Sequence, residues 1–353
     1  MQLLVLAGDG IGPEITAATR AVLKSAASRF GLDLAIEDDI VGHASLSRHG
    51  TTVRPELLYK ARAADGLILG PAATFDFKDP TKGEINPSAF FRKNLDLFAN
   101  IRPSRTYPGL PAKLGTFDLV IARENTEGFY ADRNMALGNA EMLVTEDVAI
   151  SLRRITRAAC ARIARAAFEL AATRKKHVTI VHKANVLRIG DGMFIDECRK
   201  CARDFPDVAV DDVIVDAMMA LLVRNPARFD VIVTTNMFGD IISDMTAEAS
   251  GSLGLGGSLN AGTDHAMAQA SHGSAPDIAG QNIANPFSLI LSVALLLGWH
   301  GRRRGDSAFI QAGGAIEAAV EQAIAAGEIT RDIGGRLGTK ETGEALGARI
   351  GGA

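Results

Sequence analysis

The stretch Asp230-Val-Ile-Val-Thr-Thr-Asn236 runs almost directly into Phe238-Gly-Asp-Ile-Ile-Ser-Asp244. A short apolar run is typical of a buried strand, and the residues after it favour the start of a helix. Asp240 and Asp244 are four positions apart, so the two carboxylates are expected on one helical face, about 5–6 Å from each other. They follow the carboxyl end of a strand, which is where ligands bind in open α/β sheets.

Two carboxylates this close repel each other unless a cation lies between them. Carboxylate oxygens suit hard divalent ions, so Mg²⁺ or Mn²⁺ is the expected ligand. The alternative is a solvated helix start that is stabilised by acidic residues without any metal. The pair alone leaves both interpretations open.

The same alternation of strand and helix patterns continues along the chain and predicts an α/β fold with a mixed, largely parallel sheet. The predicted strands are residues 3–7, 66–69, 119–122, 178–181, 213–215 and 231–234. The predicted helices are residues 14–29, 150–172, 192–205, 217–224, 241–250, 286–298 and 315–325. Residues 78–87 and 251–262 are rich in Pro or Gly and predict loops, the second of them a loop or lobe junction.

Length and composition exclude several classes of protein. A chain of 353 residues is long enough for two lobes, each with its own core. A net charge of -3 gives no reason to expect nucleic acid or an anionic membrane as a partner. The longest apolar stretch, residues 289–299, is too short to cross a bilayer. Three cysteines make no disulfide framework, and no export signal is visible, so we expect a cytoplasmic protein.

The glycines of Gly8-Asp-Gly-Ile-Gly-Pro13 lie between a predicted strand and a predicted helix. Their spacing is GxGxG rather than GxGxxG, and no acid follows at the distance that the dinucleotide fingerprint needs. We therefore expect a tight turn near a ligand, and a cofactor site that is not of the Rossmann type.

Further polar residues can be grouped by their chemistry. Arg92, Arg102 and Arg123 could bind a substrate with two or more carboxylates, because the arginine fork is always charged and binds carboxylates in a bidentate manner. Lys183 and Asp216 each lie at the end of a predicted strand, and Tyr130 follows Arg123. A lysine near cations can act as a base and a tyrosine can donate a proton. Taken singly, each of these residues is more often structural.

Together these segments resemble the metal-dependent, β-decarboxylating dehydrogenases of 2-hydroxy acids, the family of isocitrate, 3-isopropylmalate, homoisocitrate and tartrate/malate dehydrogenases. The resemblance covers nearly the whole chain, in the family's order. Its motifs are Gly8-Asp-Gly-Ile-Gly-Pro-Glu14, Asn100-Ile-Arg-Pro103, Arg123-Glu-Asn-Thr-Glu-Gly128, His182-Lys-Ala-Asn-Val186, Gly239-Asp-Ile-Ile-Ser-Asp244 and His272-Gly-Ser-Ala-Pro-Asp-Ile-Ala-Gly280.

The resemblance implies a role for each group of residues. Arg92, Arg102 and Arg123 would hold the substrate carboxylates. Asp240 and Asp244, with Asp216 of the other subunit of a homodimer with shared active sites, would hold Mg²⁺ or Mn²⁺. Lys183, also from the other subunit, would help to remove the hydroxyl proton while hydride passes to the nicotinamide. The resulting keto acid would lose its β-carboxylate through Lewis-acid catalysis by the metal, and Tyr130 would protonate the enol carbon.

The resemblance also implies how the dinucleotide binds. The implied contacts are Ile11, Asn185, His272, Gly273, Ser274, Ala275, Asp277 and Asn285. An acid such as Asp277 accepts hydrogen bonds from a ribose 2′-hydroxyl but repels a 2′-phosphate. Relatives that use NADP have a lysine and a tyrosine where this chain has Asp277 and Ile278, so NAD is the expected cofactor.

The choice of substrate within the family depends largely on the residues just before Arg92. Asn86 and Ser88 are polar, whereas isopropylmalate enzymes have leucines in this stretch and isocitrate enzymes have serine and asparagine in the opposite order. A branched alkyl group would lose apolar burial worth about 0.8 kcal/mol per CH₂ against polar groups. We therefore expect a 3-substituted (R)-malate with a polar C3 substituent, such as isocitrate. The alternatives are 3-isopropylmalate, homoisocitrate and tartrate or D-malate.

The expected architecture is the family's two-lobed fold with a cleft. Residues 1–98 and 252–353 would form a large cofactor-binding lobe, and residues 99–251 a small lobe that carries the dimer interface. Residues 141–149 are rich in β-formers and could supply strands to that interface. One alternative of another class is a non-catalytic regulatory subunit, but the lysine, the tyrosine and the metal-binding acids that such a subunit would lack are all present.

Overall fold

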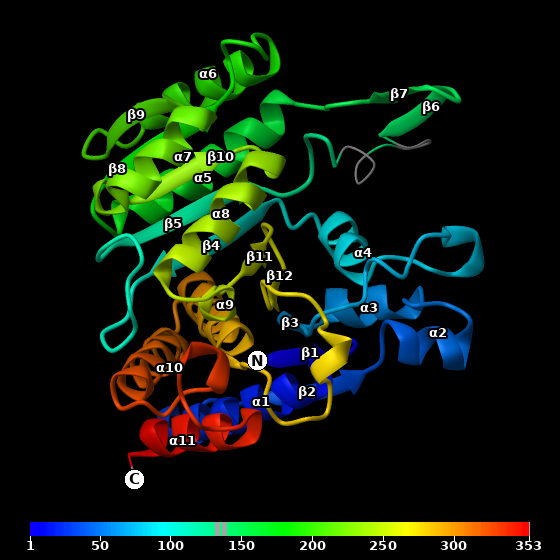
Figure 1. Cartoon of the computed structure of the whole chain (residues 1–353), viewed down its shortest axis with the longest axis vertical. Coiled ribbons are helices and arrows are strands. Elements are labelled where there is room, and N and C mark those ends of the chain that lie inside the picture. Colours follow the sequence, from blue (N-terminus) through cyan, green and yellow to red (C-terminus); the bar gives the residue numbers. More distant parts are fainter. Residues whose placement is uncertain (131–134, 136–139, 353) are drawn as a thin grey trace. The chain divides into compact units, whose positions relative to one another are not determined.

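The computed structural model describes residues 1–130, 135 and 140–352. The chain forms two compact units (Figure 1). Unit 1 consists of Met1–Leu95, Tyr107–Pro111 and Gly251–Ala353, and unit 2 of Asp96–Thr106 and Ala112–Ser250.

The sheet of unit 1 has the strand order β2-β1-β3-β12-β11. Neighbouring strands from β2 to β12 are parallel, and β11 is antiparallel to β12. Strands β1 and β3 are buried along nearly their whole length, as expected where helices cover both faces of a parallel sheet. The strands are β1 (Gln2–Leu6), β2 (Ala35–Asp39), β3 (Gly66–Leu69), β11 (Leu259–Ala261) and β12 (Ala266–Gln269).

The described part of unit 1 contains four long helices. Helix α9 packs against β12, and its apolar residues are buried nearly all round the helix, as expected of a core helix. The long helices are α1 (Gly12–Phe30), α9 (Phe287–Arg304), α10 (Ser307–Ala325) and α11 (Thr339–Gly351). The shorter helices are α2 (His43–His49), α3 (Glu56–Ala63) and α4 (Pro87–Asn94), with 3₁₀ turns η1 (Pro80–Lys82), η4 (Leu253–Leu255), η5 (Pro276–Ile278) and η6 (Arg331–Ile333).

Unit 2 has a sheet with helices on both faces. The strand order is β4-β5-β10-β8-β9, with β4 antiparallel to β5 and the other pairs parallel. Side chains alternate between the faces: Val231 and Val233 pack with α5 and α6, and Ile232 packs with α7 and α8. The strands are β4 (Ala99–Arg105), β5 (Asp118–Glu124), β8 (His177–His182), β9 (Ala209–Ile214) and β10 (Val231–Thr234). The helices are α5 (Arg157–Ala172), α6 (Gly190–Ala202), α7 (Val215–Arg224) and α8 (Asn236–Ser250), with a 3₁₀ turn η3 (Pro226–Arg228).

A two-stranded antiparallel hairpin, β6 (Glu141–Thr145) and β7 (Val148–Ser151), completes unit 2. Every residue of both strands is exposed, although several are large and apolar. Leu143 is 71% exposed and Val144 is 52% exposed. An isolated hairpin is only marginally stable in water, and large apolar side chains are more often buried than exposed.

The predicted α/β class with a mixed, largely parallel sheet is confirmed, and strands β3 and β10 begin and end where predicted. Several predicted boundaries are wrong, among them the start of the helix predicted at residues 315–325, which begins at Ser307. The helix predicted from residue 150 begins at Arg157, because residues 148–151 belong to β7 and the Thr156 hydroxyl caps the helix. The strand predicted at 213–215 spans Ala209–Ile214, and its exposed edge position hid its pattern. The helix predicted from residue 241 begins at Asn236.

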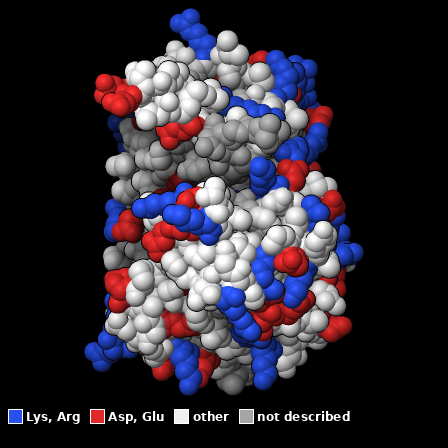
Figure 2. Space-filling model, turned by 90° about the vertical axis from the view of Figure 1, so that its right-hand side faces the viewer, with Lys and Arg blue, Asp and Glu red and all other residues white. Residues whose placement is uncertain are grey.

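Residues 251–262, predicted as a loop or lobe junction, contain η4 and the short strand β11. Within the described part of the chain, no helix has both the length and the apolarity to cross a bilayer. Lys and Arg side chains are interspersed with Asp and Glu on the face of the molecule that Figure 2 shows.

Candidate functional site

The topology of unit 2 gathers the predicted polar residues at strand ends. The parallel strands β5, β10 and β8 are neighbours, so their carboxyl ends lie along one edge of the sheet. Arg123 lies near the end of β5, Lys183 directly follows β8, and Asp240 is in the first turns of α8 after β10. Cationic and anionic side chains that follow three neighbouring strands therefore lie at the same edge of the sheet of unit 2.

Arg123 is buried, with 2% of its side chain exposed, and it is tied to α8. Its Nε and Nη2 donate to Oδ1 of Asn236 at 3.1 and 2.7 Å, and its Nη1 forms an ion pair with Asp240. A Cβ at Gly239 would lie 2.6 Å from Cγ of Arg123, so only glycine lets the helix approach this closely. The guanidinium is therefore held in one orientation by three polar contacts.

A second arginine joins the two aspartates of the opening sequence stretch. Nη1 of Arg102, in β4, lies 3.0 Å from Oδ1 of Asp244, 3.3 Å from Oδ1 of Asp240 and 2.7 Å from Oγ of Ser243. Desolvation raises the pKa of the Asp244 carboxyl, and nearby Asp240 raises it further, while Arg102 opposes the shift. The predicted pair of carboxylates is thus present on one face of α8, where Asp240 contacts Arg102 and Arg123, and Asp244 contacts Arg102.

Tyr130 belongs to the same network. Its hydroxyl donates to Oδ2 of Asp240 at 3.3 Å, and the centroid of its ring lies 5.8 Å from Cζ of Arg123. The loop that leads to Tyr130 is fixed by two buried glutamates. Glu124 accepts from the backbone N–H groups of Thr126 and Glu127, and burial raises the pKa of its carboxyl. Glu127 accepts from both the backbone and the hydroxyl of Thr156. These contacts fix the strand-to-loop turn from which Tyr130 extends.

Lys183 and Asp216 form a separate pair. Nζ of Lys183 lies 2.5 Å from Oδ1 of Asp216, and this hydrogen bond lowers the pKa of the aspartate. The backbone N–H of Lys183 donates to the fully buried Asp191 at 2.6 Å, and Asp191 also forms an ion pair with Arg153 at 2.6 Å. Asn185 is exposed in the turn that follows Lys183.

The donor chemistry of two acidic side chains on α8 fits Mg²⁺ or Mn²⁺. Asp240 and Asp244 offer hard carboxylate oxygens from one helical face, with 35% and 54% of their side chains exposed. Among residues 1–130, 135 and 140–352 there is no group of three or more acidic, histidine or cysteine side chains that could hold a metal ion. Asp216 therefore does not join the other two aspartates within the described part of this chain.

The remaining substrate-binding candidates lie in unit 1, at helix α4. Arg92 and Ser88 are both 8% exposed and face the same acceptor: Nη2 of Arg92 and Oγ of Ser88 each lie 3.0 Å from Oε1 of Gln269. Oδ1 of Asn86 accepts from the backbone N–H of Ala89 at 3.1 Å and caps the helix. The side-chain oxygen of Asn86 is thus used to cap helix α4. Its amide N–H groups could donate to a ligand.

Most of the predicted cofactor residues line a pocket of unit 1. Ile11, His272, Gly273, Ala275 and Asn285 border a cavity of about 260 Å³. The remaining lining residues are Gly254, Ile278, Ile283, Ala284 and Asp332. Burial lowers the pKa of His272, which favours a neutral imidazole. Asp277 is exposed at the 3₁₀ turn η5 and lies outside this lining.

The glycine motif at the start of α1 supports the cofactor loop. The backbone N–H of Ile11 donates to the carbonyl of Ser274 at 2.9 Å. Gly10 has φ +57°, and a Cβ there would lie 1.9 Å from that carbonyl oxygen. Ala275, which follows Ser274 in the chain, has the left-handed conformation that non-glycine residues rarely adopt, with φ 37°. The motif therefore makes a tight turn against a strained loop, as its failure to match the dinucleotide fingerprint led us to expect.

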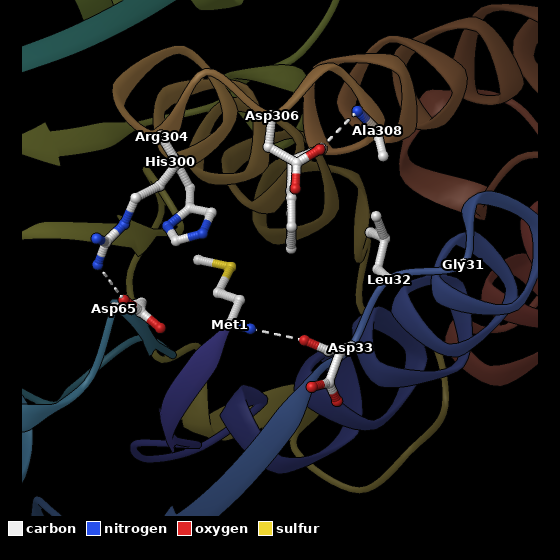
Figure 3. Close-up of a pocket in the computed structure, with 10 residues that line it drawn as sticks. Met1, Gly31, Leu32, Asp33, Asp65, His300, Arg304, Asp306 and Ala308 are labelled. Atoms are coloured by element: carbon white, nitrogen blue, oxygen red, sulfur yellow. Dashed lines mark hydrogen bonds and ion pairs between the residues drawn. The ribbon is translucent and has the colours of Figure 1, made fainter.

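A second pocket of unit 1, of about 410 Å³, contains none of the predicted site residues (Figure 3). The charged groups that line it largely bond one another or the backbone. The Met1 ammonium donates to the carbonyl of Asp33 at 2.6 Å, and Arg304 lies 2.9 Å from Asp65. Asp306 accepts from the backbone N–H of Ala308, where it caps α10. We therefore assign these contacts to the stability of unit 1.

Comparison with known proteins identifies the class. A family model described as isocitrate/isopropylmalate dehydrogenase matches residues 2–346. The chain belongs to this family, and it is a dehydrogenase.

Individual relatives are similar over almost their whole length. An isocitrate/homoisocitrate dehydrogenase of Thermus thermophilus is 40% identical over 346 residues, which cover 98% of this chain and 97% of the relative. A 3-isopropylmalate dehydrogenase of Archaeoglobus fulgidus is 38% identical over 345 residues, 96% of each chain. The crystal structure of isocitrate dehydrogenase from Methylococcus capsulatus matches with a TM-score of 0.87 at 36% identity and covers 99% of both chains.

Sequence reasoning missed several residues that the structure brings to these sites. Asp191 and Arg153 hold the backbone of Lys183, and Gln269 holds Arg92 and Ser88. Ile283 and Asp332 line the pocket of the cofactor loop. Asp191 occurs in an ordinary helix start and Gln269 at the end of a short strand, so neither carried a motif. Only the tertiary contacts single them out.

Proposed function

We propose that the protein catalyses the NAD-dependent, Mg²⁺- or Mn²⁺-dependent oxidative decarboxylation of a 3-substituted (R)-malate. The observation that carries this proposal is the contact network of Arg102, Arg123, Asp240, Asp244 and Tyr130. It combines cations for carboxylates, oxygen donors for a hard metal ion and a hydroxyl for proton transfer. A purely structural ion pair would not need all three.

Each group has a distinct task in this proposal. Arg92, Arg102 and Arg123 bind the substrate carboxylates through charge-assisted hydrogen bonds. Asp240 and Asp244 provide metal ligands, and Tyr130 delivers a proton to C3 after CO₂ has left. Lys183 takes the hydroxyl proton of the substrate, and NAD, when bound, would accept the hydride from C2. When bound, the metal ion would act as a Lewis acid toward the oxygens at which negative charge develops.

The same proposal requires two copies of the chain, with Lys183 and Asp216 acting in the site of the partner subunit. Two observations support it. Lys183 and Asp216 pair with each other and not with Asp240 or Asp244 among the described residues. The hairpin β6–β7 exposes apolar side chains along both strands, as a surface buried by a second copy would. A self-complementary contact of this kind is typical of a twofold homodimer.

NAD is the proposed cofactor, bound at the pocket of Ile11, His272, Gly273, Ala275 and Asn285. Ser274 and Asp277 belong to the same loop, and Asn185 of unit 2 would lie near the nicotinamide. The neutral His272 adds no charge to the pocket. The carboxylate of Asp277 would bind a ribose 2′-hydroxyl.

Replacing Asp277 with lysine and Ile278 with tyrosine is expected to shift the preference from NAD toward NADP. The lysine removes the repulsion of a 2′-phosphate and supplies an opposite charge. The measurement is the ratio of kcat/KM for the two cofactors. We expect the ratio to change by more than about tenfold, as for one charge-assisted hydrogen bond. An unchanged ratio would contradict the assignment of Asp277, and Asp264→Lys, at an exposed aspartate of the same unit, is the matched control.

The C3 substituent of the substrate is proposed to be polar, as in isocitrate. The polar side chains of Asn86 and Ser88 support this choice, because they would leave a branched alkyl group without apolar contacts. Relatives named for isocitrate/homoisocitrate and for 3-isopropylmalate are almost equally similar to this chain, so 3-isopropylmalate is the second candidate.

The test is steady-state kinetics of the purified protein on isocitrate, 3-isopropylmalate, homoisocitrate, D-malate and tartrate, with NAD and Mn²⁺. Highest kcat/KM is expected for isocitrate or another substrate with a polar C3 group. A tenfold preference for 3-isopropylmalate would defeat this choice of substrate while keeping the reaction. Turnover should disappear with a chelator and return with Mn²⁺. Failure to turn over any of these substrates would favour the alternative, a non-catalytic regulatory subunit.

We also propose a cytoplasmic location. Cys160, Cys198 and Cys201 are free thiols in the structure, and burial raises the pKa of each. Thiols of this kind are compatible with a reducing compartment. The location would be measured by labelling the native protein and finding which cell fraction contains it.

A further inference from the structure

One side chain outside the predicted set connects the substrate-binding candidates of unit 1. Oε1 of Gln269 lies 3.0 Å from Oγ of Ser88, 3.0 Å from Nη2 of Arg92 and 3.3 Å from Nδ2 of Asn260. Three groups therefore donate to a single amide oxygen. Ser88 and Arg92 come from helix α4 and Asn260 from β11, so this oxygen joins two elements to the end of β12.

The identity of that acceptor atom follows from its neighbours. A guanidinium can only donate hydrogen bonds, so the atom of Gln269 that faces Arg92 must be the oxygen. The Asn260 amide nitrogen also approaches the carbonyl of Met267, which is consistent with its acting as a donor. Ser88 must then donate its hydroxyl proton to Gln269 as well, which leaves the lone pairs of Oγ for other contacts.

Gln269 itself is rigidly placed. It is the last residue of β12, which pairs with β3, and its backbone N–H donates to the carbonyl of Ser258 at 3.1 Å. Its backbone carbonyl accepts from Oγ of Ser292 in α9 at 3.0 Å. Ser88 and Arg92 are each 8% exposed and Asn260 is fully buried. A side chain on a strand fixed from both sides can therefore hold a buried guanidinium in one orientation.

We propose that Gln269 is a positioning residue that orients Arg92 and Ser88 for the C3 side of the substrate. This rests on the proposed function, in which both residues contact the substrate. Because an amide is neutral, Gln269 fixes the guanidinium without cancelling its charge. The full positive charge of Arg92 thus remains for a carboxylate, whereas a carboxylate at position 269 would form an ion pair with it and weaken that attraction.

The test is a double-mutant cycle of Gln269→Met and Arg92→Met, with isocitrate and 3-isopropylmalate as substrates. Methionine has a similar length but cannot accept these hydrogen bonds well. We expect Gln269→Met to raise substrate KM about tenfold, the effect of one lost hydrogen bond to a charged group, while the KM for NAD stays within about twofold. In the Arg92→Met background the same change should have little further effect, because coupled residues are not additive.

The matched control is Gln322→Met, at an exposed position of α10 in the same unit, which should leave both KM values unchanged. An unchanged substrate KM in Gln269→Met, or full additivity in the cycle, would overturn the inference. If Arg92→Met alone leaves KM unchanged, the proposed role of Arg92 fails instead. Should Gln269→Met not fold, Gln269→Glu keeps the acceptor and is expected to raise substrate KM through its charge. An unchanged KM in that variant would equally overturn the inference.

Discussion

Replacing Lys183 with methionine is expected to lower kcat by about 10²–10⁴-fold, the usual contribution of a general acid or base. Substrate KM should stay within about threefold, because Lys183 is proposed to move a proton and not to bind a carboxylate. The protein should remain folded. Asp216, the partner of Lys183, has 67% of its side chain exposed, and such surface pairs contribute little to stability. Steady-state kinetics would measure kcat and KM, and a thermal melt would show whether the variant remains folded.

The matched control is Lys24→Met, at an exposed position of α1, which should have wild-type kinetics. A kcat of Lys183→Met within threefold of the wild type would remove the lysine from the mechanism.

Mixing two inactive variants tests whether Lys183 acts across subunits. In a heterodimer of Lys183→Met with Tyr130→Phe, one site would combine an intact Tyr130 with the intact Lys183 of the other copy. Random assortment of equal amounts makes half the dimers mixed, each with one complete site. About a quarter of wild-type activity should return after refolding the mixture together. No recovery would show that both residues act within one chain, which would contradict the shared site.

Replacing Arg123 with methionine is expected to raise substrate KM by about 10–100-fold, because a hydrogen bond to a charged group contributes about 1.5–3 kcal/mol. The change should also lower the free energy of unfolding by about 1–3 kcal/mol, the cost of leaving a buried hydrogen-bonding group without its partner. It would leave Asp240 and the buried Asn236 without the guanidinium that holds them. Kinetics and chemical denaturation would measure these two effects.

Arg123→Lys is the informative companion variant. It keeps the charge but loses the planar fork that contacts Asn236 through both Nε and Nη2. We expect a KM between those of the wild type and Arg123→Met. Arg188→Met, at an exposed position elsewhere in unit 2, is the control and should leave substrate KM unchanged. If Arg123→Met binds substrate as tightly as the wild type but is destabilised, the arginine is structural only.

The parts of the fold that follow from local patterning could be predicted. Continuous apolar runs located β3 and β10 to the residue, because buried parallel strands have an unambiguous pattern. The edge strand β9 was misplaced, and the last residues of the hairpin strand β7 were assigned to a helix, because exposed strands carry no such pattern. Strands were correctly expected within residues 141–149. The start of α5 was wrong because residues 148–151 form the exposed strand β7, so the helix begins only after Thr156, whose hydroxyl accepts from the backbone N–H of Ala159.

Those parts of the candidate site whose functional side chains lie on a single helix or strand could be predicted. Asp240 and Asp244 share one face of α8, so their spacing alone indicated the pair. The contact of Gln269 with Ser88 and Arg92 spans more than 170 residues and could not be found from spacing. The same holds for Asp191, whose burial against Arg153 gives it a role that its sequence context does not suggest.

The most direct test of the central claim is anomalous diffraction from a crystal of the protein grown with Mn²⁺ and a substrate carboxylic acid. We expect one manganese peak at coordination distance, about 2.0–2.3 Å, from oxygens of Asp240 and Asp244 and of Asp216 from the partner subunit. Well-ordered substrate with no manganese at those oxygens would contradict the proposed mechanism. So would a manganese ion held by one chain alone.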